Sequence, residues 1–168
     1  SNVAGAHLLE DSVSYENKAK GIDSNSGPNI RVYNSTSYNN ESHNIALYTS
    51  DKTLTTDYKA RGVISFRKGS NIAEQIALQK QSADEIIDAS NYFWDKELNL
   101  SQNTQGIIVT EGDFVSLDTE IAPSRNEDGA VDMHGLLVLT KEGKSKLAAG
   151  AKIDKKEEKP DVTPKDDE

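Results

Sequence analysis

Residues Asn71–Leu98, with the sequence NIAEQIALQKQSADEIIDASNYFWDKEL, carry the largest block of apolar side chains in the chain. Asn71 followed three residues later by Glu74 is typical of a helix start, because a short polar side chain caps a free N–H and a carboxylate lies near the positive helix end. On a helix of about 3.6 residues per turn, the following apolar side chains fall on one face: Ile72, Ile76, Ala83, Ile86, Ile87, Phe93, Trp94 and Leu98. We therefore expect one long amphipathic helix over about 71–98, with Trp94 buried against a sheet.

Strand patterns flank this stretch on both sides. Ile30–Tyr33, Asn44–Thr49 and Gly62–Arg67 precede it, and each combines β-branched or aromatic residues with polar neighbours. After it, residues 106–140 predict a three-stranded antiparallel meander whose last hairpin turns at Asp128-Gly129.

The middle strand of the meander has a clear alternation. Val115, Leu117 and Ile121 are expected to face the core, since a strand alternates its side chains with a period of two. Together with the helix, these strands predict an α+β fold: an antiparallel β-sheet or β-sandwich-like domain packed by one long central helix.

Three segments are expected along the chain. Residues 1–29 predict an N-terminal helical or linker segment, 30–151 a single α+β domain, and 152–168 a charged, disordered tail rich in Lys, Glu, Asp and Pro. No internal repeat is evident.

Composition limits the classes of partner. The net charge is −9 and the pI is about 4.8, so nucleic acid and anionic membranes are not expected as partners, because binding to phosphates depends on clustered Lys and Arg. The chain has no cysteine, which excludes disulfides, thiol catalysis and Cys-ligated metals. No stretch approaches the run of about 20 apolar residues that a transmembrane span needs.

Candidate site residues are few. His7, His43 and His134 lie far apart in the sequence, which does not match the ligand spacing of a metal motif. Acidic side chains concentrate near the last hairpin. Two carboxylates and one carboxamide there could supply oxygen ligands to calcium: Asp128, Asp132 and Asn126. No catalytic residue and no cofactor is predicted, because the chain contains no nucleophile-elbow, phosphate-loop or zinc-protease motif.

One resemblance bears on function. Residues 4–19, which contain Leu8-Leu9 and the run Tyr15-Glu16-Asn17-Lys18-Ala19, resemble the segment that follows the membrane helix in archaeal filament subunits. There too a β-domain follows. The resemblance implies a soluble domain of a pilus- or archaellum-type subunit that lacks its hydrophobic N-terminal helix.

The leading hypothesis is a non-enzymatic domain of a secreted or cell-surface protein, with a binding or structural role. Polar loops of Asn, Ser, Thr and Tyr suit recognition of a protein or a surface glycan. Two alternatives stay open: the filament subunit, and a hydrolase with an acidic site.

Overall fold

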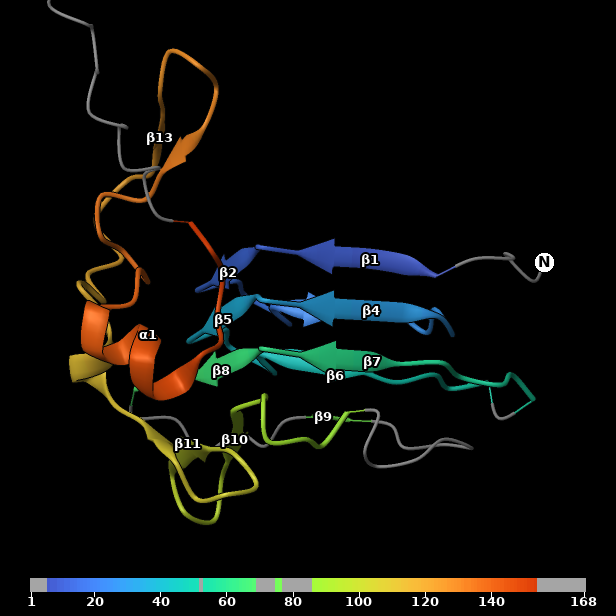
Figure 1. The fold of residues 1–168 in the computed structure, drawn as a ribbon. Coiled ribbons are helices and arrows are strands. Elements are labelled where there is room, and N and C mark those ends of the chain that lie inside the picture. Colours follow the sequence, from blue (N-terminus) through green and yellow to red (C-terminus); the bar gives the residue numbers. More distant parts are fainter. Residues whose placement is uncertain (1–5, 52, 69–74, 77–85, 154–168) are drawn as a thin grey trace, which may run out of the picture.

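The computed structural model describes residues 6–51, 53–68, 75–76 and 86–153. The first half of the chain winds into a coil whose parallel strands stack in three layers (Figure 1). The β1–β4–β7 sheet comprises His7–Glu10, Ile30–Tyr33 and Lys59–Arg61. The β2–β5–β8 sheet comprises Val13–Tyr15, Thr36–Tyr38 and Ile64–Phe66. The β3–β6–β9 sheet comprises Ile22–Asp23, Ile45–Leu47 and Gln75–Ile76.

Each turn of the coil lies in register on the previous one. Val13 pairs with Thr36, and Thr36 pairs with Ile64, so equivalent residues are separated by 23 positions and then by 28. A parallel bridge from Ile64 to Tyr92 extends this stacking into a fourth turn. The chain therefore contains a structural repeat, and the fold is a β-helix-like stack of parallel strands.

The predicted α+β fold is therefore wrong. Within the expected helix 71–98, Gln75–Ile76 forms β9 and Phe93–Asp95 forms β10, while residues 69–74 and 77–85 lie outside the described part of the chain. The apolar spacing misled because short apolar strands separated by turns can imitate a helical period. Trp94 is nonetheless buried, with 5% of its surface exposed, which confirms the expectation for that side chain.

The expected N-terminal helix is also replaced by strands. β1 and β2 both lie within the segment that resembles the filament subunits, and both pair in parallel with the next turn of the coil. Leu9 packs against the coil interior from this first turn, so its apolar side chain belongs to a strand face. By contrast, the predicted strands at Ile30–Tyr33, Asn44–Thr49 and Gly62–Arg67 are confirmed as β4, β6 and β8.

The interior of the coil is partly apolar and partly polar. Its apolar half contains Ile22, Val32, Ile45, Leu47, Tyr58, Ala60, Val63 and Ile86. On the β2–β5–β8 side, Ser14, Ser37 and Ser65 stack in register, and Asn40 and Asn44 lie buried beside them.

Two buried carboxamides join successive turns of the coil. The Asn40 side chain accepts hydrogen bonds from the backbone N–H (3.0 Å) and the carboxamide (2.7 Å) of Asn17 in the first turn. It donates to Ser37 (3.0 Å) and to the side-chain oxygen of Asn44 (2.9 Å). Asn44 in turn donates to the Phe66 carbonyl in the third turn (2.9 Å). Gly21 leaves room for this network, because a Cβ there would lie 2.4 Å from the Asn40 side-chain nitrogen.

The second half of the chain covers the outer face of the β2–β5–β8 sheet (Figure 1). Tyr38 stacks on Phe66, and Phe66 stacks on Phe114, with ring centroids 5.9 and 5.5 Å apart. This cover includes α1 (Lys141–Leu147), the 3-10 helix Glu111–Asp113, and the antiparallel β10–β11–β12 sheet, formed by Phe93–Asp95, Leu100–Gln102 and Ile108–Val109. Among the described residues, no helix is long and apolar enough to cross a membrane.

The meander predicted over 106–140 is not formed as a continuous sheet, because Phe114 and Ser116 make only isolated bridges, to Leu139 and Leu136. The predicted facing is wrong for Val115, which is 59% exposed while its neighbour Phe114 is buried. It is confirmed for Leu117 and Ile121, which pack against the core. The hairpin at Asp128-Gly129 is confirmed: it joins β13 (Ser124–Arg125) to β14 (Val131–Asp132), with Gly129 at φ 83°.

The buried carboxamides lead to a stability prediction. Asn40→Ala should lower the free energy of unfolding by about 2–3 kcal/mol, because buried partners in two turns lose hydrogen bonds. Asn29→Ala, at the turn before β4, should change it by less than about 1 kcal/mol. Urea denaturation followed by circular dichroism would measure both, and equal effects would contradict a special role for Asn40.

Candidate functional site

The outer face of the β1–β4–β7 sheet carries a group of cationic and aromatic side chains. Val32 and Ala60 point into the core, so their strand neighbours point outward by the period of two. Those outward residues are paired across the strands, Arg31 beside Lys59 and Tyr33 beside Arg61. We call Arg31, Tyr33, Lys59 and Arg61 the cationic face.

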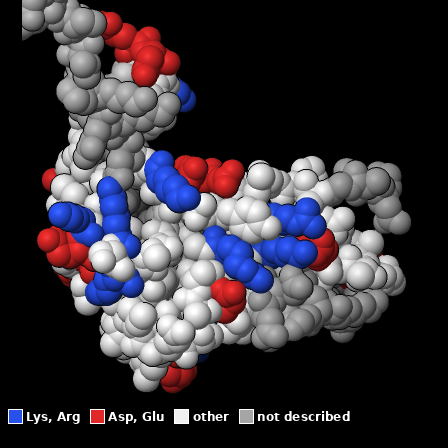
Figure 2. All heavy atoms as spheres, in the orientation of Figure 1, with Lys and Arg blue, Asp and Glu red and all other residues white. Residues whose placement is uncertain are grey.

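Three carboxylates partly compensate the positive charge of this face, and one of them is Glu10 on β1, which pairs with Tyr33 in the same outward row. The Asp57 carboxylate forms an ion pair with the Arg31 guanidinium at 2.7 Å and lies 3.8 Å from the Lys59 ammonium. A single carboxylate is therefore shared by two cations. Arg61 lies 3.4 Å from Asp88. Figure 2 shows blue Lys and Arg side chains gathered over β4 and β7, with red carboxylates at their edges.

Asp88 is held in its charged form at this edge. Although burial acts to raise its pKa, hydrogen bonds from the Ser90 hydroxyl and backbone N–H and the nearby Arg61 charge lower the pKa of Asp88 below its ordinary value. Asp88 therefore stays ionised at neutral pH and fixes the position of Arg61 at one end of the cationic face.

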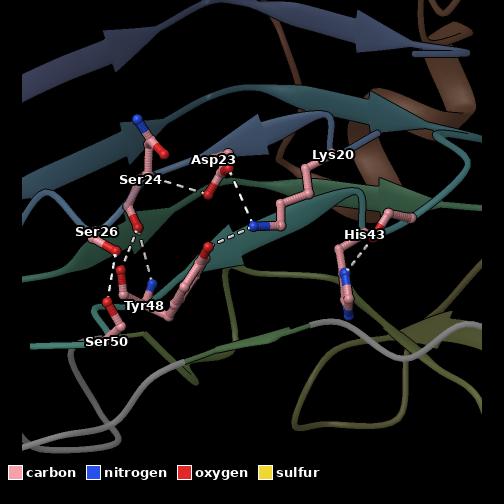
Figure 3. Close-up of polar contacts among 9 residues, drawn as sticks. Lys20, Asp23, Ser24, Ser26, His43, Tyr48 and Ser50 are labelled. Atoms are coloured by element: carbon pink, nitrogen blue, oxygen red, sulfur yellow. Dashed lines mark hydrogen bonds and ion pairs between the residues drawn. The ribbon is translucent and has the colours of Figure 1, made fainter. Parts of the chain in front are cut away.

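A second polar group lies on the turn before β3 and at the end of β6. The Lys20 ammonium donates to the Tyr48 hydroxyl at 2.7 Å and to the Asp23 carboxylate at 3.3 Å, and it lies 4.3 Å from the centre of the Tyr48 ring. Figure 3 shows this ammonium between the other two groups. The hydrogen bond with Tyr48 raises the pKa of Lys20 above its ordinary value, and Asp23 acts in the same direction.

His43 lies near this group but has a different partner. Its Nδ1 is 2.9 Å from the Ser42 hydroxyl. Burial lowers the pKa of His43, and the positive charges of Arg67 and Lys20 lower it further. The imidazole is therefore neutral at pH 7. Because Lys20 is already matched by Asp23, this group is less suited to an anionic ligand than the cationic face.

The three residues predicted as oxygen ligands lie together on the β13–β14 hairpin. Asp128 accepts the backbone N–H of Ala130 (3.0 Å), and Asp132 accepts that of His134 (2.8 Å), so each carboxylate stabilises its own turn. Asn126 closes the hairpin through its backbone N–H to the Ala130 carbonyl (2.9 Å). In the described part of the chain, no group of three or more His, Asp or Glu side chains could hold a metal ion. Metal binding by Asn126, Asp128 and Asp132 stays a prediction.

The sequence did not reveal the cationic face. Arg31 precedes Lys59 by 28 positions and Arg61 by 30, and only the register of the coil brings them side by side. One signal could have indicated them: in both strands a basic residue directly precedes a small apolar residue that is buried, Arg31 before Val32 and Lys59 before Ala60.

Comparison with known proteins yields one distant relative. Over 136 residues, which are 80% of this chain, the sequence is 27% identical to the pectate lyase L of Paenibacillus polymyxa strain SC2. The chain spans only 26% of the length of that protein. No protein-family model matches the sequence, and no solved structure matches it.

The Lys20–Tyr48 contact leads to a titration prediction. Tyr48→Phe should lower the pKa of Lys20, because the phenol oxygen that accepts a hydrogen bond from the charged ammonium is removed. NMR titration of the lysine side-chain signals would measure the shift, with the exposed Lys18 as an internal reference. An unchanged Lys20 pKa would show that the Tyr48 hydroxyl does not stabilise the ammonium in solution.

Proposed function

We propose that this chain is part of a secreted β-helix protein that binds an acidic polysaccharide along its cationic face. The observation that carries the proposal is the cross-strand pairing of Arg31 with Lys59 and of Tyr33 with Arg61 on an outer sheet face. The relative named above is a lyase of pectate, an anionic polysaccharide, which suggests the class of ligand.

The spacing of the cations suits a repeating polyanion. Neighbouring strands lie about 4.8 Å apart, so cations on β4 and β7 present positive charge at intervals close to the length of one sugar residue. The guanidinium of an arginine can also bind a carboxylate through two parallel hydrogen bonds. Arg31 and Arg61, on different strands and different rows of the face, could then contact different uronate units.

The existing ion pairs do not prevent such binding. The side chains of Arg31 and Arg61 are 32% and 42% exposed, and those of Asp57 and Asp88 are 44% and 29% exposed. Exposed ion pairs contribute only about 0–1 kcal/mol each, so a carboxylate of the ligand can compete for the same cations.

Tyr33 adds a surface for the sugar ring itself. It is half-buried in the row that also contains Arg61, and its outward position follows from the inward position of Val32. An aromatic ring offers an apolar face and a polar hydroxyl, which matches the mixed polarity of a pyranose. A face that combines arginine and tyrosine can therefore recognise both the charge and the ring.

Binding to polygalacturonate would test the proposal. Affinity should fall about two- to fivefold for each of Lys59→Ala and Arg61→Ala, as expected for the loss of one exposed charge contact. Affinity should also fall with added salt, because both partners are charged. Isothermal titration calorimetry or affinity electrophoresis would measure it.

The matched control is Lys96→Ala, since Lys96 is 52% exposed and lies in the turn between β10 and β11, next to Glu97. It should leave the affinity unchanged. A neutral galactan should bind much more weakly than polygalacturonate. Equal binding of the neutral and acidic polymers, or equal effects of all three substitutions, would reject the proposal.

A further inference from the structure

We propose that a pocket beside the cationic face binds a single uronic acid residue of the polysaccharide, through Lys144, Lys152 and Asn34. The inference rests on the proposed function and adds a defined subsite to it. The pocket has a volume of about 290 Å³ and lies between the end of β4 and the segment that follows α1. Ligand pockets usually range from about 300 to 1,000 Å³, so this one fits one sugar residue rather than an oligosaccharide.

The pocket adjoins the cationic face, because it lies next to the ends of β4 and β7, where Tyr33 and Arg61 are the last residues. Asn34 directly follows Tyr33, takes a positive φ of 43°, and its backbone N–H bonds to the Arg61 carbonyl (2.9 Å). Gly62 directly follows Arg61, and its carbonyl accepts the N–H of Gly150 (2.8 Å). A polysaccharide that crosses β4 and β7 at Tyr33 and Arg61 therefore passes within one residue of Asn34 and Gly62, next to the pocket.

The wall of the pocket is fixed by contacts with the coil. The backbone N–H of Ala151 donates to the Thr36 hydroxyl (3.0 Å), and that of Lys152 donates to the Asp11 carboxylate (3.2 Å). Gly150 is packed so closely that a Cβ there would lie 2.9 Å from the Ile64 side chain. The segment that carries Lys152 is thus held against the sheets, which preorganises the pocket.

The lining combines charge with a small, smooth surface. The lining residues include two exposed lysines, Lys144 and Lys152, together with Asn34. Between them lie Ala148, Ala149 and Ala151, whose methyl groups leave space for a sugar ring. Two ammonium groups favour a carboxylate, and the carboxamide can bind sugar hydroxyls. Figure 2 shows a further group of blue side chains over α1, separated by white surface from those over β4 and β7.

Nearby acidic groups set a limit on the ligand. Glu10 and Asp11 end the first strand of the same sheet and are both exposed, and Glu142 lies in the first turn of α1. Asp11 is engaged by the Lys152 backbone N–H. These carboxylates disfavour a ligand with several charges close together, which agrees with one uronate residue rather than a phosphorylated or sulfated sugar.

The test uses galacturonic acid and galactose as probes on the whole chain. NMR titration with galacturonic acid should shift the backbone amides of Asn34, Gly150 and Ala151, whereas galactose should not. The double substitution Lys144→Gln and Lys152→Gln should reduce the galacturonic acid affinity at least fivefold. Lys141→Gln, on the same helix but outside the pocket lining, should leave it unchanged.

The outcomes separate the two proposals. If polygalacturonate binds through Lys59 and Arg61 but galacturonic acid leaves the three amides unshifted, the pocket is not a uronate subsite and the proposed function stands. If the amides shift with galacturonic acid while polygalacturonate does not bind the cationic face, the subsite stands and the proposed function fails. Equal shifts with galactose would overturn the role of the lysines.

Discussion

The in-register stacking of parallel strands is the constraint on which the rest of this structure depends. Backbone hydrogen bonds hold each turn on the next, so a side chain in one turn lies over its equivalent in the turn before. Some rows therefore repeat one kind of residue along the coil. Inward serines form one row, and outward aromatics form another: Tyr15, Tyr38 and Phe66 are paired across three strands. Other rows do not repeat, since Val13, Thr36 and Ile64 are also paired in register.

The in-register stacking also determines which outer sheet faces are apolar and become buried, and which are polar and stay exposed to solvent. The outer row of the β2–β5–β8 sheet is apolar, and the second half of the chain buries it under Phe114, Leu136, Leu139 and Leu147. The outer rows of the β1–β4–β7 sheet contain arginine, lysine and tyrosine, and the described part of the chain leaves these side chains partly exposed. The interior hydrogen bonds of Asn40 and Asn44 then allow a coil with a narrow apolar core to keep its turns aligned. The fold therefore presents one rigid sheet face to a ligand.

The sequence predicted individual strands better than their arrangement. Ile30–Tyr33 and Gly62–Arg67 have local patterns of β-branched and aromatic residues that do not depend on partners. The repeat stayed hidden because the turns differ in length and because serine and asparagine occupy inward positions that a pattern search expects to be apolar. For residues 71–98, apolar spacing alone could not distinguish a helix from short strands joined by turns. The cationic face could not be predicted for a related reason: its residues become neighbours only through the register of β4 and β7, which the sequence did not reveal.

Net charge is a poor guide to the ligand of such a protein. A chain with a charge of −9 is expected to repel a polyanion, yet charges beyond about 10 Å are largely screened at physiological salt. Much of the negative charge is placed away from the cationic face: Glu120, Glu127, Asp128 and Asp132 lie on or near the β13–β14 hairpin, which projects away from β4 and β7 (Figure 1). A ligand that lies over β4 and β7 meets Arg31, Lys59 and Arg61 with Asp57 and Asp88, and it meets Glu10 of β1 in the same outward row as Tyr33 and Arg61. This face is therefore close to neutral while the protein as a whole has a net charge of −9, so an anionic chain can bind where the two arginines and Lys59 are gathered.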